Sequence, residues 1–285
     1  MSSTEMTVSP VAGALGADVH GVNLSEPMGD NLFKAVNDAL LEHQVLFFHD
    51  QEITPDQQIG FAKRFGDIHY HPYISGMPDH PEIVEIIKTE SESKNFGGSW
   101  HSDQMFNRCP AKLTMLYAKE VPEAGGDTLF ASMYAAHDAL SDGMRKMLGE
   151  LHTFNVGDRF KNQGGKTRRE VMTGTSSMRL KDPDPDQDTE AVHPTLRTHP
   201  ETGRKALYIG GHTHRFDELT DEESEGLLDY LRKYSVRPEF TCRFRWKRNS
   251  LALWDNRCTQ HFAVNDYAGK RRVMHRITIA GDATF

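Results

Sequence analysis

The chain has 285 residues, a net charge of −8, 37% apolar residues and 26% charged residues, as is typical of a globular enzyme of one large or two small domains. The acidic balance disfavours nucleic-acid binding, and no apolar run approaches the roughly 20 residues that span a membrane. Three cysteines without CxxC spacing, and an N-terminus without a basic region followed by an apolar core, predict a cytoplasmic protein with no signal peptide and no disulfide framework.

The first half of the chain predicts an alternation of helices and short strands. Apolar residues recur at helical spacing over residues 30–43, and Thr54 followed by Pro55 is typical of the start of a helix, which we expect to end near Gly66. Strands are expected at 45–48, 82–88, 113–118 and 128–131, and short helices at 132–140 and 142–148.

The second half begins with residues 158–193, which have little periodic pattern and predict a lid or a flexible insertion. A capping box from Thr220 to Glu223 then opens an amphipathic helix. Strands are expected at 239–246, 251–254 and 273–280. Strands with scattered helices and no βαβ rhythm predict a single mainly β domain over residues 1–285 with flanking helices, namely a distorted double-stranded β-helix (jelly-roll) barrel.

Three residues form a candidate metal-binding set. His101 and Asp103 are two residues apart, which places both side chains on one side of an extended segment. An isolated His-x-Asp is more often a solvated loop, but His261 offers a third ligand from another strand. Two histidines and one carboxylate are the ligand set of non-heme Fe(II) oxygenases.

Two arginines near the C-terminus form a candidate anion site. Arg272 and Arg276 are four residues apart on a predicted strand, so they share one face. Buried guanidinium groups are costly unless they meet anions, and a carboxylate matches the two-point geometry of an arginine. The alternative is a pair of surface arginines on an edge strand.

Four motifs, in this order and spacing, closely resemble the taurine / 2,4-dichlorophenoxyacetate dioxygenase family. They are Trp100-His101-Ser102-Asp103, Gly125-Gly126-Asp127-Thr128, Trp254-Asp255-Asn256-Arg257 with His261, and Arg271 to Arg276. The resemblance runs from about Val8 to Asp282. Members of this family are Fe(II)- and 2-oxoglutarate-dependent oxygenases, so the resemblance implies Fe(II) as cofactor, 2-oxoglutarate as cosubstrate and O₂ as reactant.

The resemblance also implies roles for matched positions. His101, Asp103 and His261 would bind the metal and carry catalysis. Thr128 and Arg272 would hold the distal carboxylate of 2-oxoglutarate.

For the substrate anion, the matched positions are His71, which precedes Pro72, and Arg276. The pocket differs from the taurine pattern, because glycine replaces an asparagine before the Trp-His pair and His212 stands where a phenylalanine lines the pocket. We therefore expect a small anionic substrate: a sulfonate such as taurine, a sulfate ester or an aryloxy-carboxylate.

Other interpretations remain open at this point. The chain could be a metal-dependent jelly-roll enzyme with non-oxidative chemistry, or a small-anion-binding protein. His212 and His214 could form a second metal pair, although no third ligand has suitable spacing. The basic region 237–276 could bind nucleic acid, but its basic positions alternate with apolar ones, which favours a clamp for small anions. We expect a homo-oligomer, dimer or tetramer, without nucleic-acid or membrane partners.

Overall fold

A computed structural model describes residues 5–157, 170, 177–182 and 186–285. Much of the insertion predicted at 158–193 lies outside the described residues, so its role as a lid stays a prediction. Its last residues, however, belong to a strand, β8 (Glu190–Pro194).

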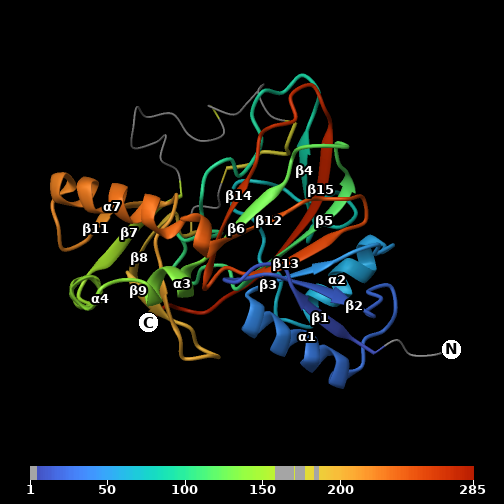
Figure 1. The fold of residues 1–285 in the computed structure, drawn as a ribbon. Coiled ribbons are helices and arrows are strands. Elements are labelled where there is room, and N and C mark those ends of the chain that lie inside the picture. The colour runs from blue at the N-terminus through green and yellow to red at the C-terminus, as the bar shows by residue number, and fades with distance from the viewer. Residues whose placement is uncertain (1–4, 158–169, 171–176, 183–185) are drawn as a thin grey trace.

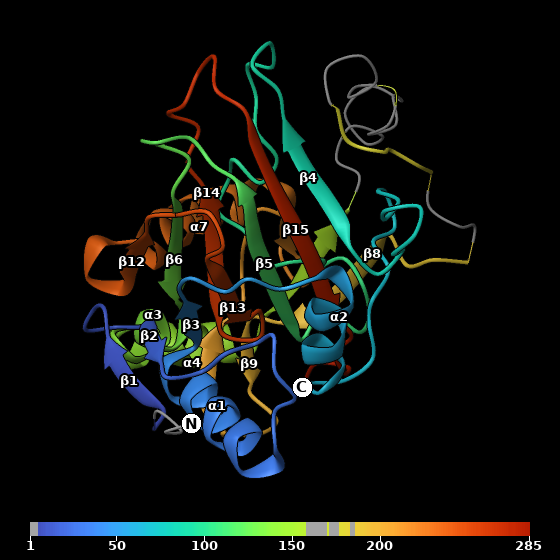
Figure 2. The ribbon, with the colours of Figure 1, turned by 90° about the vertical axis from the view of Figure 1, so that its right-hand side faces the viewer.

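The largest sheet has seven strands in the order β1-β2-β3-β13-β5-β15-β4. Its pairs are antiparallel except for β2 with β3. Figure 2 shows β4, β15 and β5 running side by side. The strands are β1 (Thr7–Pro10), β2 (Ala17–His20), β3 (Val45–Phe48), β4 (Val84–Lys88), β5 (Leu113–Glu120), β13 (Leu251–Asp255) and β15 (Arg272–Ile279).

Three smaller sheets and five α-helices complete the described fold (Figure 1). One sheet, ordered β12-β6-β14, comprises Thr241–Phe244, Thr128–Ser132 and Thr259–Ala263. Another places β7 (His152–Val156) between β11 (Thr213–Phe216) and β8, and β9 (Leu196–Thr198) pairs with β10 (Lys205–Leu207). The helices are α1 (Asp30–His43), α2 (Pro55–Lys63), α3 (Met133–Asp138), α4 (Asp142–Gly149) and α7 (Asp221–Ser235), followed by a 3₁₀ turn at Pro238–Phe240.

Strand β3 is an inner strand of the large sheet and is buried on both faces. Successive side chains of a strand point to opposite faces. Phe47 faces the β12-β6-β14 sheet, where its ring stacks on Phe244 with 4.1 Å between centroids. Leu46 and Phe48 face the other way and join the core under α1 and α2. Two cores, one on each face, therefore hold the large sheet rigid.

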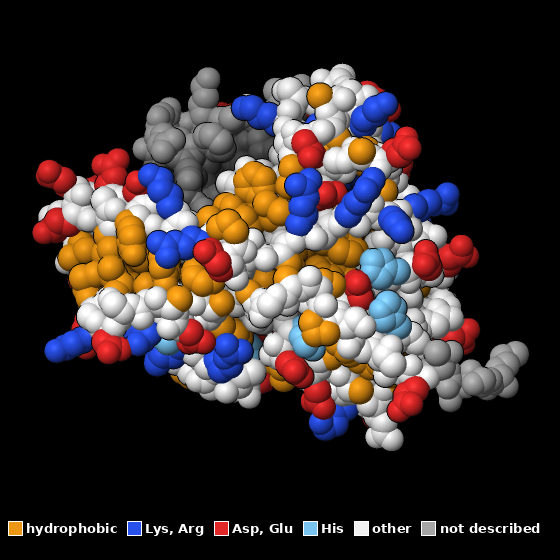
Figure 3. Space-filling model, in the orientation of Figure 1, with side chains coloured by type: hydrophobic (Ala, Val, Ile, Leu, Met, Phe, Trp, Pro, Cys, Tyr) orange, Lys and Arg blue, Asp and Glu red, His pale blue; other side chains and the backbone are white. Residues whose placement is uncertain are grey.

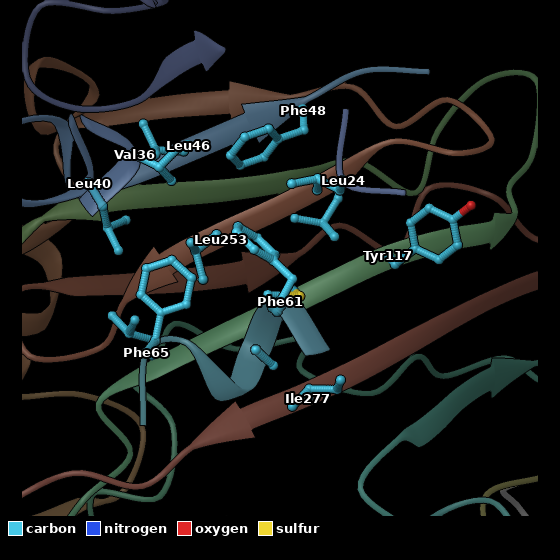
Figure 4. Packing of buried hydrophobic residues seen from close by; sticks show 14 of the residues in the cluster. Leu24, Val36, Leu40, Leu46, Phe48, Phe61, Phe65, Tyr117, Leu253 and Ile277 are labelled. Atoms are coloured by element: carbon cyan, nitrogen blue, oxygen red, sulfur yellow. The ribbon is translucent and has the colours of Figure 1, made fainter. Parts of the chain in front are cut away.

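Figure 4 shows the core that lies between the large sheet and the helices α1 and α2. Val36 and Leu40 of α1 and Phe61 of α2 pack against the large sheet, reaching Leu253 of β13 and Ile277 of β15. Burial of such side chains contributes roughly 1.5–3 kcal/mol each. This packing fixes β15, the strand that carries both candidate arginines.

The predicted helices are confirmed within a few residues. α1 spans the predicted 30–43, while α2 ends at Lys63, slightly before the predicted end. Capping boxes open α2 at Thr54 and α7 at Thr220. The short strands β7 to β11, each of three to five residues, have no clear sequence signal and are not predicted.

The predicted strand at 239–246 is shorter in the structure. β12 spans only Thr241–Phe244, because the 3₁₀ turn takes up the residues before it. Within the described part of the chain, no helix has both the length and the apolar character needed to cross a bilayer.

Candidate metal centre and anion-binding cavity

Two backbone hydrogen bonds join the segments that carry the candidate histidines. His101 N donates to His261 O at 3.1 Å, and His261 N donates to His101 O at 2.8 Å. His261 lies on β14, so this antiparallel bridge extends that sheet into the loop before Ser102. The bridge brings the two imidazole rings to 4.2 Å between centroids. Residues far apart in the sequence are thereby held by main-chain geometry.

The three predicted ligands converge on one point. Asp103 Oδ1 lies 3.7 Å from His101 Nε2 and 3.9 Å from His261 Nε2. The ligand atoms of the three residues all lie within 4.8 Å of one another. Two imidazole nitrogens and one carboxylate oxygen at this spacing fit a divalent transition metal that keeps open positions on its other side.

The Asp103 carboxylate is held firmly on its second oxygen. Thr114 Oγ1, on the neighbouring strand β5, donates a hydrogen bond to Asp103 Oδ2 at 2.6 Å. Burial by itself raises the pKa of Asp103, but the guanidinium of Arg276, the largest opposing cause, helps to hold that pKa well below its usual range. Asp103 is therefore a carboxylate at neutral pH, as a metal ligand must be.

The imidazoles are arranged to present nitrogen lone pairs. His101 Nδ1 lies 2.6 Å from Ser99 O, which places the proton on Nδ1 and leaves Nε2 as the acceptor that faces Asp103. Burial, followed by the neighbouring His101, lowers the pKa of His261 well below its usual value. His261 is therefore neutral at neutral pH and able to coordinate a metal.

The two candidate arginines are buried and share a face of β15, as predicted. Arg272 and Arg276 are each 5% exposed. β15 pairs with β4 on one side and β5 on the other, so the alternative of surface arginines on an edge strand is wrong.

Both guanidinium groups have N–H groups to spare. Nε and Nη2 of Arg272, and the same atoms of Arg276, have no hydrogen-bond partner among the described residues. Arg276 Nη2 lies 3.0 Å from Asp103 Oδ1, but its N–H groups are not aimed at that oxygen, so the contact is an ion pair. Buried, unsatisfied donors of this kind fit bound anions.

Thr128 lies beside Arg272 with its hydroxyl oriented. Trp246 Nε1 donates a hydrogen bond to Thr128 Oγ1 at 2.9 Å, so the hydroxyl proton is left to point elsewhere. Thr128, Arg272 and His261 line one small cavity together. The wall between the metal ligands and Arg272 can therefore offer a hydroxyl and a guanidinium to one carboxylate.

A larger cavity of about 380 Å³ adjoins the candidate metal ligands His101 and Asp103. His71, His212 and Arg276 line it together with the rings of Phe96 and Phe106. Its size falls at the lower end of the range for pockets that bind small organic ligands.

The ring nitrogens of both cavity histidines take defined roles. His71 Nδ1 accepts a hydrogen bond from Tyr73 N at 3.1 Å, which leaves Nε2 as the donor of the neutral ring. His212 Nδ1 lies 3.2 Å from Val156 O and acts as the donor there. In each ring, the backbone contact at Nδ1 indicates which nitrogen of the neutral imidazole carries the proton.

Glycine at position 211 lets the cavity wall approach the candidate ligand His101. A Cβ added to Gly211 would lie 2.9 Å from Trp100 O and 3.4 Å from His101 Cβ. Backbone so close to a ligand leaves no room for a side chain.

The second metal pair left open by the sequence has no basis in the described residues. His214 is exposed on β11 and shares no group of three metal-ligating residues with His212. A second buried group, His199, Asp255 and Cys258, is otherwise engaged. The guanidinium of Arg257 donates two hydrogen bonds to Asp255, at 2.8 and 2.6 Å, and burial raises the pKa of the Cys258 thiol well above its usual value. That group is a structural network.

The sequence analysis does not predict four residues that lie at or beside the site: Thr114, Trp246, Gln104 and Lys88. The hydroxyl of Thr114 interrupts an apolar strand, which is the one sequence signal that could have marked it. Lys88 pairs with Arg272 across the strands, is 3% exposed, and places its ammonium 4.5 Å from the ring centroid of Tyr267. It adds a second buried cation beside Arg272.

Comparison with known proteins finds relatives that match nearly the whole chain. A sulfate ester dioxygenase of Pseudomonas putida, described as alpha-ketoglutarate-dependent, is 32% identical over 98% of this chain and 90% of that protein. Two crystal structures superpose closely. A taurine dioxygenase from Burkholderia xenovorans gives a TM-score of 0.82 at 29% identity, covering 99% of this chain and 91% of that one. AAD-2 in complex with Mn(II) and N-oxalylglycine gives 0.78 at 28% identity, covering 99% of both chains.

The family model for the taurine catabolism dioxygenases matches nearly the whole chain. It covers residues 7–278 and therefore includes all three predicted metal ligands and both arginines. The resemblance stated from the sequence motifs is confirmed: the chain belongs to the taurine catabolism dioxygenase TauD, TfdA family.

Proposed function

We propose that this chain is an Fe(II)- and 2-oxoglutarate-dependent dioxygenase that hydroxylates a small anionic substrate and releases succinate and CO₂. The observation that carries the proposal is the convergence of His101, Asp103 and His261 beside two buried arginines with unsatisfied N–H groups. The large sheet and the β12-β6-β14 sheet form the two walls of a distorted jelly-roll barrel. The whole chain is one domain, with residues 158–193 as a lid-like or flexible insertion.

The metal is held by His101 Nε2, His261 Nε2 and one oxygen of Asp103. Iron bound there supplies the activation of O₂ that couples decarboxylation of 2-oxoglutarate to hydroxylation of a C–H bond. Burial keeps the His261 imidazole neutral, and the hydrogen bond from His101 Nδ1 to Ser99 O leaves Nε2 of His101 as the acceptor. Thr114 keeps the carboxylate from rotating away.

Arg272 and Thr128 hold the distal carboxylate of 2-oxoglutarate. A dicarboxylate that reaches from this wall to the metal ligands is oriented at both of its ends. The guanidinium has N–H donors at Nε and Nη2, and the Thr128 hydroxyl offers a third donor, since its O–H stays available while the oxygen accepts from Trp246.

Arg276, His71 and His212 hold the anion of the substrate in the larger cavity. Anchoring the anion orients the adjacent carbon toward the metal ligands. Holding the reacting C–H bond in place there lowers the barrier to its hydroxylation. The Phe96 and Phe106 rings shield this part of the cavity from water.

The substrate is a sulfonate such as taurine, a sulfate ester or an aryloxy-carboxylate. Relatives named for a sulfate ester and for a phenoxypropionate are each 32% identical to this chain, which supports both of these classes. Hydroxylation at the carbon next to oxygen turns an alkyl sulfate into an unstable hydroxylated ester, which collapses to an aldehyde and inorganic sulfate. A sulfonate would give an aldehyde and sulfite, and an aryloxyacetate would give a phenol and glyoxylate.

Two measurements on the purified chain test the reaction class. Fe(II) and 2-oxoglutarate, added without oxygen, should give a weak visible charge-transfer band. Air and a panel of sulfate esters, sulfonates and aryloxy acids should then give substrate-dependent succinate. No band and no succinate would leave a non-oxidative enzyme or a small-anion-binding protein as the better description.

Three variants test the assigned roles. His101→Ala should abolish metal binding at the centre, because a ligand is lost. Arg272→Ala should chiefly weaken binding of 2-oxoglutarate, and Arg276→Ala binding of the primary substrate. Arg271→Ala is the matched control, since Arg271 precedes Arg272 but is 38% exposed and pairs with Glu120. Wild-type affinities in both Arg272→Ala and Arg276→Ala would refute the assignment.

We also propose that the chain forms a homo-oligomer, a dimer or tetramer. Figure 3 shows apolar side chains gathered on the side of the molecule that carries α7. Tyr230 of α7, Val192 of β8 and Met147 of α4 are among the exposed large apolar residues. Light scattering after gel filtration measures the mass directly, and a monomer at micromolar concentration would refute this proposal.

A further inference from the structure

Gln104 follows the metal ligand Asp103 and lines the same cavity of about 380 Å³. Only 2% of its surface is exposed. Both polar atoms of its carboxamide, Oε1 and Nε2, are buried and have no hydrogen-bond partner among the described residues. A buried amide that pairs with nothing is costly, and native proteins rarely keep one without a reason.

The backbone of Gln104 carries a second cost. Its φ of 55° lies in the left-handed region, which residues other than glycine rarely adopt. Gln104 O accepts a hydrogen bond from Asn107 N at 3.0 Å, so a local turn holds this conformation. Strain and an unpaired polar group at one position beside a metal ligand are typical of residues kept for function.

The other polar groups of the cavity have defined tasks. His71 and His212 are oriented by backbone contacts, and Arg276 is the cation for an anion. The carboxamide is neutral and offers one acceptor and two donor hydrogens. It therefore adds nothing to charge recognition but can recognise a group that both donates and accepts hydrogen bonds.

We infer that Gln104 is a specificity-determining residue and that the substrate carries, besides its anion, a hydroxyl or carboxamide group that pairs with the Gln104 side chain. The inference rests on the proposed function and narrows its substrate class to polar, bifunctional anions. A purely alkyl anion of the same length would leave the carboxamide buried and unpaired. The cavity therefore discriminates against that anion, as sites built for a substrate hydroxyl do.

The test compares two matched series of compounds: linear alkyl sulfates, and the same sulfates with a terminal hydroxyl. Binding is measured by calorimetry on the Mn(II)- and 2-oxoglutarate-loaded chain without oxygen, and kcat/KM is measured by succinate release with Fe(II). The wild-type chain should prefer the best hydroxylated compound over its alkyl counterpart by about ten- to hundred-fold.

Gln104→Met keeps the length of the side chain and removes both polar atoms, so it should abolish or reverse this preference. Gln104→Asn retains a carboxamide on a shorter side chain and should keep part of the preference for the hydroxylated compounds. Affinity for 2-oxoglutarate should stay unchanged in both variants, which a merely structural role would not predict. Gln58→Met is the matched control: Gln58 is a buried glutamine of α2 outside the cavity, whose amide donates to His275 O at 3.3 Å.

Equal binding of the two series by the wild-type chain, or a preference that survives in Gln104→Met, overturns the inference. Equal binding would mean that ordered water satisfies the carboxamide. Calorimetry needs no turnover, so it decides on Gln104 even for a chain that releases no succinate. Preferential binding without succinate would support the inference on Gln104 and count against the proposed reaction alone.

Discussion

Thr114 carries the sharpest prediction about the metal centre. Its hydroxyl donates to Asp103 Oδ2 at 2.6 Å and accepts from Asn256 Nδ2 at 2.9 Å, and its side chain is fully buried. Thr114→Val preserves the shape of the side chain and removes only the hydroxyl. Asp103 then loses the hydrogen bond that fixes its orientation, and Asn256 loses an acceptor.

The size of the effect follows from the kind of bond removed. A hydrogen bond to a charged group contributes about 1.5–3 kcal/mol, and the loss falls on the carboxylate that must face the metal. Since 1.4 kcal/mol corresponds to about tenfold, we expect metal affinity to fall about ten- to hundred-fold. This is the range seen when the partner that orients a metal ligand is removed.

Anaerobic titration of the metal-free chain with Mn(II) or Co(II) measures this affinity. Thr153→Val is a matched control, because Thr153 is equally buried, donates to His193 O at 3.3 Å and accepts from Asn155 Nδ2 at 3.0 Å. It should lower the unfolding free energy without changing metal affinity. If Thr114→Val binds metal as tightly as the wild-type chain, the proposed orienting role of Thr114 is wrong.

Three further predictions concern the cavity wall, the cosubstrate and pH. Gly211→Ala should weaken metal binding and destabilise the fold by about 1–3 kcal/mol, because the new Cβ meets Trp100 O at 2.9 Å; an unchanged Tm would contradict this. Trp246→Phe should weaken 2-oxoglutarate binding about two- to tenfold by releasing the Thr128 hydroxyl, with calorimetry as the measurement. Burial lowers the pKa of His193 from 6.5 to about 4, so its contribution to stability is complete above pH 6.5 and is lost as pH falls toward 4. That gap corresponds to about 3 kcal/mol, and denaturant unfolding of His193→Gln should depend less steeply on pH over this range.

Much of the fold could be predicted because its signals are local. The capping boxes at Thr54 and Thr220 involve neighbours in sequence, and both open helices in the structure. The alternation on β15 likewise predicts that Arg272 and Arg276 share a face, since successive side chains of a strand alternate. Such inferences need no knowledge of which strands pair.

The supporting residues of the site could not be predicted, because their roles depend on pairing between distant segments. Thr114 meets Asp103 only because β5 lies beside the bridge that joins the segments of His101 and His261. Trp246 lies just beyond β12, and the pairing of β12 with β6 brings its indole to Thr128. Register across a sheet is a tertiary property, so no local pattern encodes these contacts.

The ion pair between Arg276 and Asp103 bears on how a newly synthesised chain matures. A carboxylate left alone in the interior costs several kcal/mol, and a metal-binding protein usually faces that cost until its ion arrives. Here a guanidinium 3.0 Å away already supplies the compensating charge. The polypeptide can therefore fold before it binds the metal. A molecule that has lost the metal still has its Asp103 carboxylate neutralised by Arg276 and can bind the metal again.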